Sequence, residues 1–483
     1  MKPSQRPAKL SAGRPAAPLL HVLQVPGNAI IGGMETYVAN LSRVLPSHGV
    51  RVSVLAPYES PYTRRLRALG CQVFVTQMDD TPSWHAIEFA AELARSLEVD
   101  LLHAHLPRAH LLAALAGRLV NRPVLATIHG LSLTAQEISL ARLSGSHLAV
   151  VCQQALLNAI AGGVPLEQVS LIPNGVDIEI YRPGGSLPAV PAVDLASAAA
   201  AGRAAAAPSA EAGPGGPGSG TVLDRPAALP TGMEPLLQPS AGLPPPEPAL
   251  EYRRMLGVPA DAPLVGYVGR IDFEKGPDLF VLLAAHVLQE CPSVHFVMVG
   301  DGHLMDEIHR QVHNLQMDAV FHFAGLSQRP WEVYPALDLV VQTSRVEGMP
   351  FALLEAMACG RAVAAFGVGG VPEVIEAGST GLLAAPGDWK GLGGGVAALL
   401  RDRPRLDEMG RAARLRVEEN FNLHDHVRQV AALYRRLAAL GAGASPASSG
   451  SGLRLDAPAA QKFFEEVQHD PRSQNQLGDH PRP

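Results

Sequence analysis

Residues 264–276 read LVGYVGRIDFEKG, a short apolar run followed at once by a loop that carries glycines and charges. Such a run is typical of a buried strand in a parallel sheet. Arg270 and Lys275 fall in the loop after it, and open α/β sheets bind ligands at the carboxyl ends of their strands. The stretch therefore predicts an α/β fold in which two positive charges are placed to receive an anion such as a diphosphate.

A second stretch, residues 337–358, predicts another strand followed by a helix. The strand is expected over 337–342, and the helix over 351–358, which are rich in Ala, Leu and Met. Glu347 then lies in the connecting loop and Glu355 inside the helix, so the two carboxylates could address different parts of one ligand. The helix start near Gly348 and Met349 would offer free N–H groups and the positive end of a dipole to a phosphate.

Apolar runs of strand length recur along the whole chain, separated by helical patterns. Strands are expected in the first half at 20–25, 50–55, 72–75, 101–103, 124–128, 147–151 and 170–172. They are expected in the second half at 264–268, 295–299, 320–323, 339–342, 362–365 and 381–384. Alternation of strands and helices indicates doubly wound parallel sheets, one in each half.

The 483 residues exceed one ordinary hydrophobic core, and composition divides them into five parts. Folded domains are expected at 19–183 and 251–410, with helices at 411–440. Residues 184–250 are dominated by Ala, Pro and Gly without apolar periodicity, so they are expected to be a disordered insert. The tail, residues 441–483, is expected to be disordered for the same reason.

Charge and cysteine usage exclude several classes of protein. A formal net charge of −6 argues against nucleic-acid binding, which needs a basic excess. The four cysteines are far apart and form no C-x-x-C pair, so neither a disulfide framework nor a zinc site is indicated. The polar residues between 19 and 31 break any signal peptide, and no apolar run could span a membrane. A cytoplasmic location is expected, and attachment at the inner face of the membrane stays open.

Competing cofactor and metal motifs fail at particular positions. A dinucleotide fingerprint starting at Gly300 meets Met305 where glycine is needed, and a P-loop starting at Gly27 meets Gly33 where lysine is needed. Three histidine pairs have ligand-like spacing but no accompanying carboxylate or thiolate cluster, and loops or solvated helix faces explain them more simply. These pairs are His103/His105, His309/His313 and His424/His426. No cofactor and no metal are expected.

The run Gly-Arg-x-Asp-x-x-Lys-Gly at 269–276, the pair Glu347-x7-Glu355 and the segment Ile172–Asp177 resemble the family-four retaining glycosyltransferases. The resemblance covers residues 19–183 and 251–440, and it implies the GT-B fold. In that fold two Rossmann-like domains face each other across a cleft, and carboxyl-terminal helices cross back to the first domain. It also implies that Arg270 and Lys275 hold the donor diphosphate, that Glu347 lies beside the donor sugar, and that Glu355 binds the ribose.

The resemblance implies further site residues. His129 would contact the donor sugar, and the alternative is that it serves only as a hydrogen-bonding residue of its loop. Gly32 and Gly33 would face the donor phosphates or the acceptor, although a tight turn without a ligand explains them too. Main-chain atoms near Gly302 and Leu326 would receive the base. Gly348 and Met349 would also bind the donor, but Met349-Pro350 departs from the commoner Phe-Gly of the family, and Pro350 removes one backbone donor from this loop.

Together with this resemblance, the sequence predicts a retaining, metal-independent transferase. It would move a sugar from a nucleotide-diphosphate donor to a glycan, lipid-linked or small-molecule acceptor. The catalytic candidates are His129, Arg270, Lys275 and Glu347. Two alternatives stay open, namely a nucleotide-sugar epimerase or hydrolase of the same architecture and a regulatory protein that binds such ligands without turnover.

Overall fold

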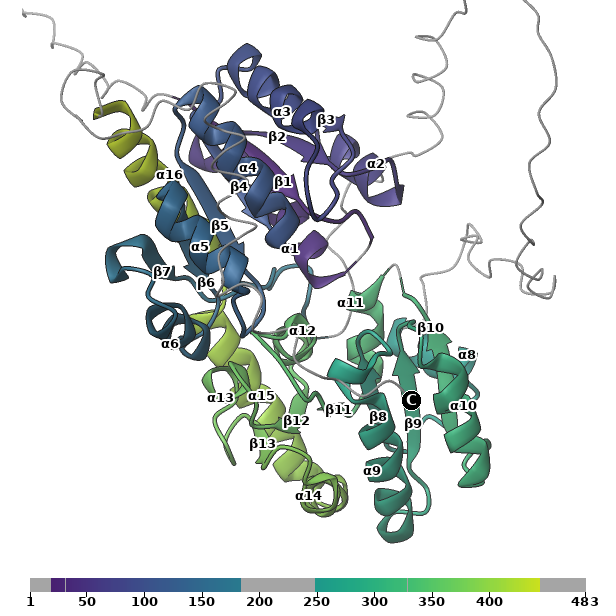
Figure 1. Ribbon diagram of the computed structural model, residues 1–483. Helices are drawn as coiled ribbons and strands as arrows, with labels where there is room; N and C mark the ends of the chain where they lie inside the picture. The colour runs from purple at the N-terminus through teal and green to yellow at the C-terminus, as the bar shows by residue number, and fades with distance from the viewer. Residues whose placement is uncertain (1–18, 31, 184–247, 328, 444–483) are drawn as a thin grey trace, which may run out of the picture.

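The computed structural model describes residues 19–30, 32–183, 248–327 and 329–443, which form two α/β domains (Figure 1). The amino-terminal domain is built on a seven-stranded sheet of order β3-β2-β1-β4-β5-β6-β7. The carboxyl-terminal domain is built on a six-stranded sheet of order β10-β9-β8-β11-β12-β13. Neighbouring strands pair in parallel in both sheets, for example β1 with β4 and β8 with β11. The expected fold class is therefore confirmed.

The strands match the apolar runs of the sequence closely. In the first sheet they are β1 (Leu20–Pro26), β2 (Val50–Ala56), β3 (Gln72–Val75), β4 (Leu101–His105), β5 (Val124–Ile128), β6 (His147–Val150) and β7 (Val169–Leu171). In the second they are β8 (Leu264–Val268), β9 (His295–Val299), β10 (Phe321–Gly325), β11 (Leu339–Gln342), β12 (Ala362–Phe366) and β13 (Gly381–Ala384). Helices cover both faces of each sheet (Figure 1), which is why the inner strands β4 and β11 are buried along their whole length.

The helices begin where capping residues and prolines stand. Ser60 and Thr134 each form a reciprocal capping box at a helix start. The helices of the first half are α1 (Gly33–Val44), α2 (Pro61–Ala68), α3 (Trp84–Ser96), α4 (Pro107–Val120), α5 (Ala135–Ser144) and α6 (Gln153–Ala161). Those of the second half are α8 (Pro248–Met255), α9 (Pro277–Glu290), α10 (Met305–Asn314), α11 (Pro330–Val333), α12 (Phe351–Ala358), α13 (Val371–Val374), α14 (Trp389–Arg401), α15 (Arg403–Asn420) and α16 (Leu423–Gly443). Short 3-10 turns are η1 (Leu45–His48), η2 (Leu166–Gln168), η3 (Phe273–Lys275) and η4 (Tyr334–Ala336).

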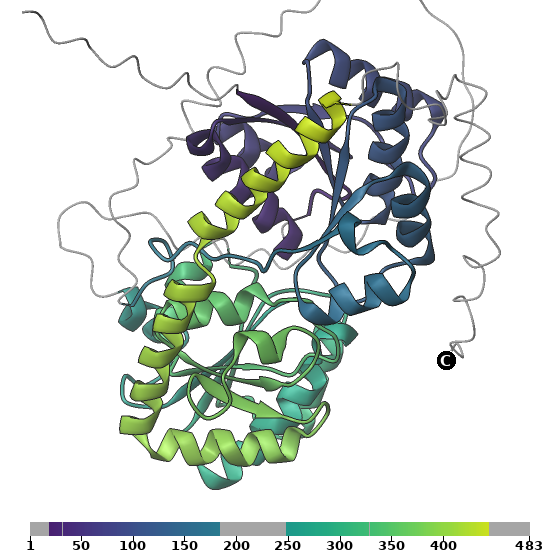
Figure 2. The ribbon, with the colours of Figure 1, turned by 90° about the vertical axis from the view of Figure 1, so that its left-hand side faces the viewer.

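Helix α16 returns from the second domain and lies along the first (Figure 2). Its residues Leu423, Val427 and Tyr434 belong to the same buried cluster as β1 and α1 of the first domain. Helices that cross back to the first domain were expected over 411–440, and the structure has two helices there, α15 and α16, with a break between them. There Asn422 forms a bridge with Val176, so the two segments that cross between the domains run side by side.

The structure also corrects two expected boundaries. Pro248, Ala249 and Leu250 are helical residues of α8 rather than part of the insert, and α16 continues to Gly443 rather than ending at 440. Residues 184–247 and 444–483, where disorder was expected, lie outside the described residues. All four cysteines are buried and free. None of the helices in the described part of the chain is long and apolar enough to cross a membrane.

Candidate active site

A buried ion pair joins the two loops that the sequence singled out. Lys275 Nζ lies 2.7 Å from both carboxylate oxygens of Glu347, and Ser344 Oγ donates to Glu347 Oε1 at 2.7 Å. The Glu347 side chain is only 4% exposed, whereas that of Lys275 is 21% exposed. The carboxylate is thus enclosed, while its lysine still reaches the surface at the carboxyl ends of β8 and β11.

Backbone carbonyls of the loop after β8 accept hydrogen bonds from the loop after β11. Thr343 Oγ1 donates to the carbonyl of Gly276 at 2.7 Å, and Arg345 N donates to the carbonyl of Glu274 at 2.7 Å. Gly276 has φ +61°, and a Cβ there would lie 2.1 Å from the Thr343 carbonyl oxygen, so only glycine fits. These contacts hold Lys275 at Glu347, a pairing that neither motif reveals alone.

Arg270 is the exposed cation of the same loop. Its guanidinium contacts Asp272 at 2.7 Å and Glu274 at 3.3 Å, and its side chain is 61% exposed. The pair with Glu274, whose side chain is 65% exposed, contributes little stability, because solvent screens it and ordering the side chains costs entropy. Arg270 can therefore exchange Glu274 for an anionic ligand at little cost.

The start of α12 supplies further positive potential beside Glu347. Pro350 is the N-cap residue, and no side chain caps the helix. The first-turn N–H groups of Phe351 and its successors therefore keep their capacity to bind an anion. Gly33, at the start of α1 in the other domain, faces this point, since a Cβ on it would lie 3.5 Å from the Phe351 ring.

The loop from Glu347 to Met349 also touches the amino-terminal domain directly. A Cβ on Gly348 would lie 2.2 Å from the carbonyl oxygen of His129, so the two backbones meet there with no room for a side chain. Asn174 Nδ2 donates to the carbonyl of Met349 at 2.9 Å. Met349 is thus engaged with the other domain, which is how the unusual Met-Pro sequence is accommodated.

His129 follows β5 and reaches this junction from the amino-terminal domain. Its Nε2 lies 3.1 Å from Nδ1 of His105, and its ring stands edge-on to Tyr37 with a centroid distance of 4.8 Å. Burial lowers the pKa of His129 to about 3. The ring is therefore neutral at pH 7, and it is suited to accept or donate a hydrogen bond rather than to supply positive charge.

Glu355 occupies a different environment from Glu347. It is 8% exposed, and the hydroxyl of Tyr334 donates to its Oε2 at 2.6 Å. Burial raises the pKa of Glu355 to about 7. The structure brings Lys275, Glu347, Gly348 and His129 together but holds Glu355 against Tyr334, so ribose binding by Glu355 stays a prediction.

Gly302, Leu326 and Gly32 are the remaining predicted site residues. Gly302 packs on the Arg270 loop, since a Cβ there would lie 2.3 Å from the Ile271 carbonyl oxygen. Leu326 follows β10 and is 58% exposed. Gly32 is the N-cap residue of α1. Their roles toward a ligand stay predictions.

Glu35 is a site-facing carboxylate that the sequence analysis missed. It lies in the first turn of α1, is 5% exposed, and has Oε2 within 2.9 Å of where a Cβ on Gly32 would stand. Burial raises the pKa of Glu35 to about 7, and Arg270 of the opposite domain acts against this rise. The sequence could have indicated this position, because a glutamate at the third residue of a helix commonly folds back toward the N-cap residue.

The histidines that were read as loop or solvated residues are partly core residues. His103 and His105 are fully buried in β4, and His426 is 3% exposed on α16. Non-local partners explain this burial, because His103 bonds Tyr434 and His426 bonds the carbonyl of Pro173. Within the described ranges, no three His, Cys, Asp or Glu side chains are grouped to hold a metal ion.

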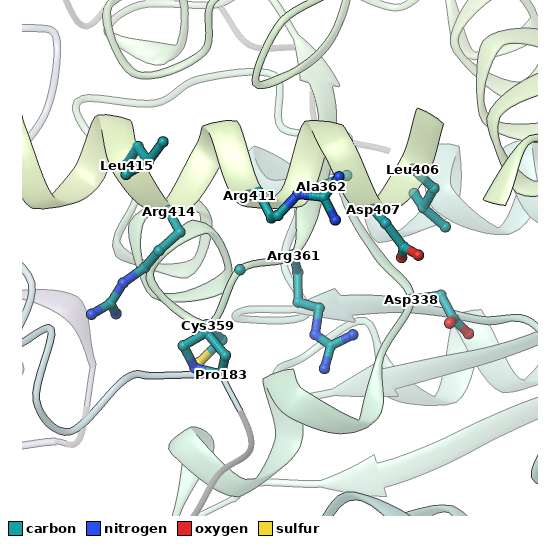
Figure 3. Close-up of a pocket in the computed structure, with 11 residues that line it drawn as sticks. Pro183, Asp338, Cys359, Arg361, Ala362, Leu406, Asp407, Arg411, Arg414 and Leu415 are labelled. Atoms are coloured by element: carbon teal, nitrogen blue, oxygen red, sulfur yellow. The ribbon is translucent and has the colours of Figure 1, made fainter. Parts of the chain in front are cut away.

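A cavity of about 450 Å³ lies elsewhere in the carboxyl-terminal domain (Figure 3). Asp338 and Arg361, which line it, precede β11 and β12, and Arg411 projects from α15. The cavity is therefore at the amino ends of these strands, the edge opposite to Glu347. It does not belong to the candidate active site.

Comparison with protein families gives two matches that together span most of the described chain. The model for glycosyl transferases group 1 matches residues 249–416, and the model for glycosyltransferase family 4 matches residues 31–180. The two matches correspond to the two domains of the structure.

Individual relatives are similar over shorter or longer stretches. The lipopolysaccharide core biosynthesis mannosyltransferase LpsB of Rhizobium meliloti is 34% identical over 200 residues, which are 40% of this chain and 57% of that protein. The 2-deoxystreptamine N-acetyl-D-glucosaminyltransferase of Streptomyces fradiae is 37% identical over 159 residues, 32% of this chain and 36% of that protein. D-inositol 3-phosphate glycosyltransferase 1 of Catenulispora acidiphila is 26% identical over 458 residues, 86% of this chain and 93% of that protein.

Solved structures share the whole two-domain fold. HepE of Anabaena, crystallised with UDP-glucose, has a TM-score of 0.67 and 20% identity, covering 86% of this chain and all of that one (100%). Sucrose-phosphate synthase of Thermosynechococcus elongatus has a TM-score of 0.62 and 19% identity, covering 87% and 100%. The predicted family is confirmed: this chain belongs to the group 1 glycosyltransferases, with a family 4 amino-terminal domain and the GT-B fold.

Proposed function

We propose that this glycosyltransferase moves a sugar from a nucleotide-diphosphate donor to a glycan, lipid-linked or small-molecule acceptor, with retention of configuration and without a metal ion. The observation that carries the proposal is the Lys275–Glu347 pair beside the uncapped start of α12. An ammonium has three N–H donors, and Glu347 can occupy two of them, so at least one is left for a phosphate oxygen. Arg270 and the helix start add to the positive potential.

The chemistry of this arrangement is the stabilisation of a leaving group. Breaking the bond between the anomeric carbon and the phosphate oxygen leaves an electron-poor sugar ring and a negatively charged diphosphate. Fixed donors placed where that charge develops lower the barrier most. Lys275, Arg270 and the N–H groups of α12 are such donors.

Attack on the same face as the leaving group fits these residues better than a covalent intermediate. Glu347 accepts hydrogen bonds from Lys275 and Ser344, and these bonds stabilise its charge and reduce its nucleophilicity. In the front-face route the acceptor hydroxyl forms the new bond to the anomeric carbon and gives its proton to the departing phosphate. Mass-spectrometric trapping of a sugar on Glu347 would contradict this route.

Candidate donors follow from the proteins that resemble this chain. HepE was crystallised with UDP-glucose, and relatives include a mannosyltransferase and an N-acetylglucosaminyltransferase. UDP, UDP-glucose and the nucleotide-diphosphate forms of mannose and N-acetylglucosamine are therefore the first ligands to test by thermal unfolding. A nucleotide at 100 times its dissociation constant should stabilise the fold by about 2.7 kcal/mol, a clear upward shift in Tm.

Turnover then tests the function itself. The donor identified by thermal shift is incubated with and without acceptors in the presence of EDTA, and the anomeric configuration of the product is read by NMR. Transfer with retention supports the proposal. Acceptor-free conversion of the donor would replace it with an epimerase or hydrolase, and binding without turnover would refute enzymatic function.

Arg270→Ala provides a matched test of the charge argument. We expect it to lower kcat by roughly 10²–10³-fold, the scale for removing one group that stabilises developing charge. Arg401→Ala is the control, because Arg401 is also exposed (52%) and paired, but with Glu290 at the far end of the domain. Equal activity of the two variants would contradict the assignment of Arg270.

A further inference from the structure

A continuous line of hydrogen bonds lies inside the amino-terminal domain and ends at His129. It passes through six side chains in the order His129, His105, Gln24, Tyr434, His103 and Thr127. The five successive distances are 3.1, 2.8, 2.9, 2.6 and 2.7 Å. Five of these side chains are at most 2% exposed, so water does not compete for the bonds, and only His129, at the junction of the two domains, is half-buried.

The fold explains why these residues meet. Strand β4 lies between β1 and β5, and the register sets His103 beside Gln24 and His105 beside Thr127. Residues two apart on a strand point to the same face, so both histidines face the side that α16 covers. Tyr434 reaches them from α16, at a sequence separation of 410 residues from Gln24.

The orientation of the Gln24 amide gives the line a direction. Gln24 Nε2 donates to the Tyr434 hydroxyl, so Gln24 Oε1 accepts from Nε2–H of His105. A neutral imidazole carries one proton, and His105 Nδ1 must therefore accept from Nε2–H of His129. On the other side, Tyr434 gives its hydroxyl proton to His103 Nδ1, and His103 donates from Nε2 to Thr127.

This line of hydrogen bonds requires that its three histidine rings are neutral, and burial keeps them neutral by lowering their pKa. Burial holds the pKa of His103 and of His105 well below the ordinary histidine value, and it lowers that of His129 to about 3. Each ring then has one donor and one acceptor at pH 7. Reversing the proton position on one ring would require reversal along the whole line.

We propose that His105 and Tyr434 are positioning residues that hold His129 as the tautomer protonated at Nε2, so that its Nδ1 accepts a hydrogen bond from a hydroxyl of the donor sugar. The inference rests on the proposed function, since it assigns a role within the same candidate active site. It gives the crossing helix α16 a role in the site, because Tyr434 of this helix acts on His129 through Gln24 and His105. The tautomer itself is a property of the free protein.

The first test reads the tautomer without any substrate. Long-range ¹H–¹⁵N spectra of the histidine rings distinguish protonation at Nε2 from protonation at Nδ1, and a His129→Gln variant identifies the His129 signals. We expect His129 to be protonated at Nε2. Protonation at Nδ1 would overturn the inference, whether or not the protein transfers sugar. Failure of transfer with every donor would instead refute the proposed function. The spectrum would still show which ring nitrogen of His129 carries the proton.

The second test uses variants with a matched control. Tyr434→Phe keeps the buried ring but removes the hydroxyl in the middle of the line. Tyr62→Phe is the control, because Tyr62 is also buried in this domain (2% exposed) and its hydroxyl has no hydrogen-bond partner. We expect Tyr434→Phe to lower kcat roughly ten-fold, as for a buried polar group deprived of its partner, with the acceptor KM unchanged.

Two substitutions of His105 test whether this residue positions His129 or only fills space in the core. Asn can still accept from His129 near the position of Nδ1, whereas Leu cannot, so His105→Asn should retain several-fold more kcat than His105→Leu at similar stability. His129 should show a mixture of tautomers in His105→Leu. Wild-type kcat in Tyr434→Phe, or equal kcat in the two His105 variants, would contradict a positioning role.

Discussion

Replacing Lys275 by Met tests the pair on which the proposed chemistry depends. The substitution keeps an unbranched side chain of similar length and removes only the ammonium that lies 2.7 Å from both oxygens of Glu347. Two separate losses follow. The site loses a charge that faces the leaving diphosphate, and Glu347, 4% exposed, keeps only the hydrogen bond from Ser344.

The two losses differ in size and in how they can be repaired. Removing one stabiliser of developing charge should lower kcat by roughly 10²–10³-fold, which corresponds to about 2.7–4 kcal/mol. Leaving one partner of a buried ion pair uncompensated should lower the free energy of unfolding by about 3–5 kcal/mol. In the double variant Lys275→Met/Glu347→Gln no uncompensated charge remains, so stability should return toward wild type while kcat stays low.

Urea unfolding and release of the nucleoside diphosphate measure the two quantities. Lys390→Met is the control, because Lys390 is the other lysine within the described residues and lies exposed beside Trp389 in the same domain. It should leave kcat and stability near wild type. Near wild-type kcat in Lys275→Met at saturating donor would refute the assigned role, and so would recovery of kcat in the double variant.

Two further predictions concern neighbouring buried groups. Because burial raises the pKa of Glu355 to about 7, the folded state binds its proton more tightly than the unfolded state. The protonated Glu355 therefore stabilises the fold fully below pH 4.5, and this contribution, at most about 3 kcal/mol, is lost as the pH rises to about 7. Urea unfolding at pH 5 and pH 8 measures the loss, and Glu355→Gln should make it smaller. An equal loss in the variant and the wild type would contradict a buried carboxylate at this position. Asn174→Ala removes the 2.9 Å hydrogen bond to the Met349 carbonyl, so it should cost about 1 kcal/mol of stability, and a neutral effect in the same assay would contradict a contribution from this contact.

The sequence predicts the strands well because the buried strands of parallel sheets are continuous apolar runs. The expected limits of β3, β5, β8, β9 and β13 coincide with the observed ones. The break between α15 and α16 was not predictable in this way. It arises where Asn422 pairs with Val176, and a contact between residues so far apart leaves no local pattern.

The site shows the same division between local and non-local information. The sequence placed Lys275 and Glu347 at the ends of two strands, but their pairing depends on the adjacency of β8 and β11, which no motif encodes. His105 was set aside because it was considered only as a metal ligand. Its partners come from β1 and from the loop after β5, and neither is near it in sequence.

The contacts divide into two sets that are each complete within one domain. Lys275, Glu347 and Ser344 all belong to the carboxyl-terminal domain, whereas the line from His129 to Tyr434 lies within the core shared by the amino-terminal domain and α16. Tyr434 stands 12 residues beyond the break at Asn422, about 18 Å along a helix. A rotation at that break would therefore leave both sets intact, and it would have to separate only the contacts that cross the junction, such as Asn174 with Met349 and Gln153 with Glu373. Such a rotation would change neither the Lys275–Glu347 pair nor the hydrogen bond between His129 and His105.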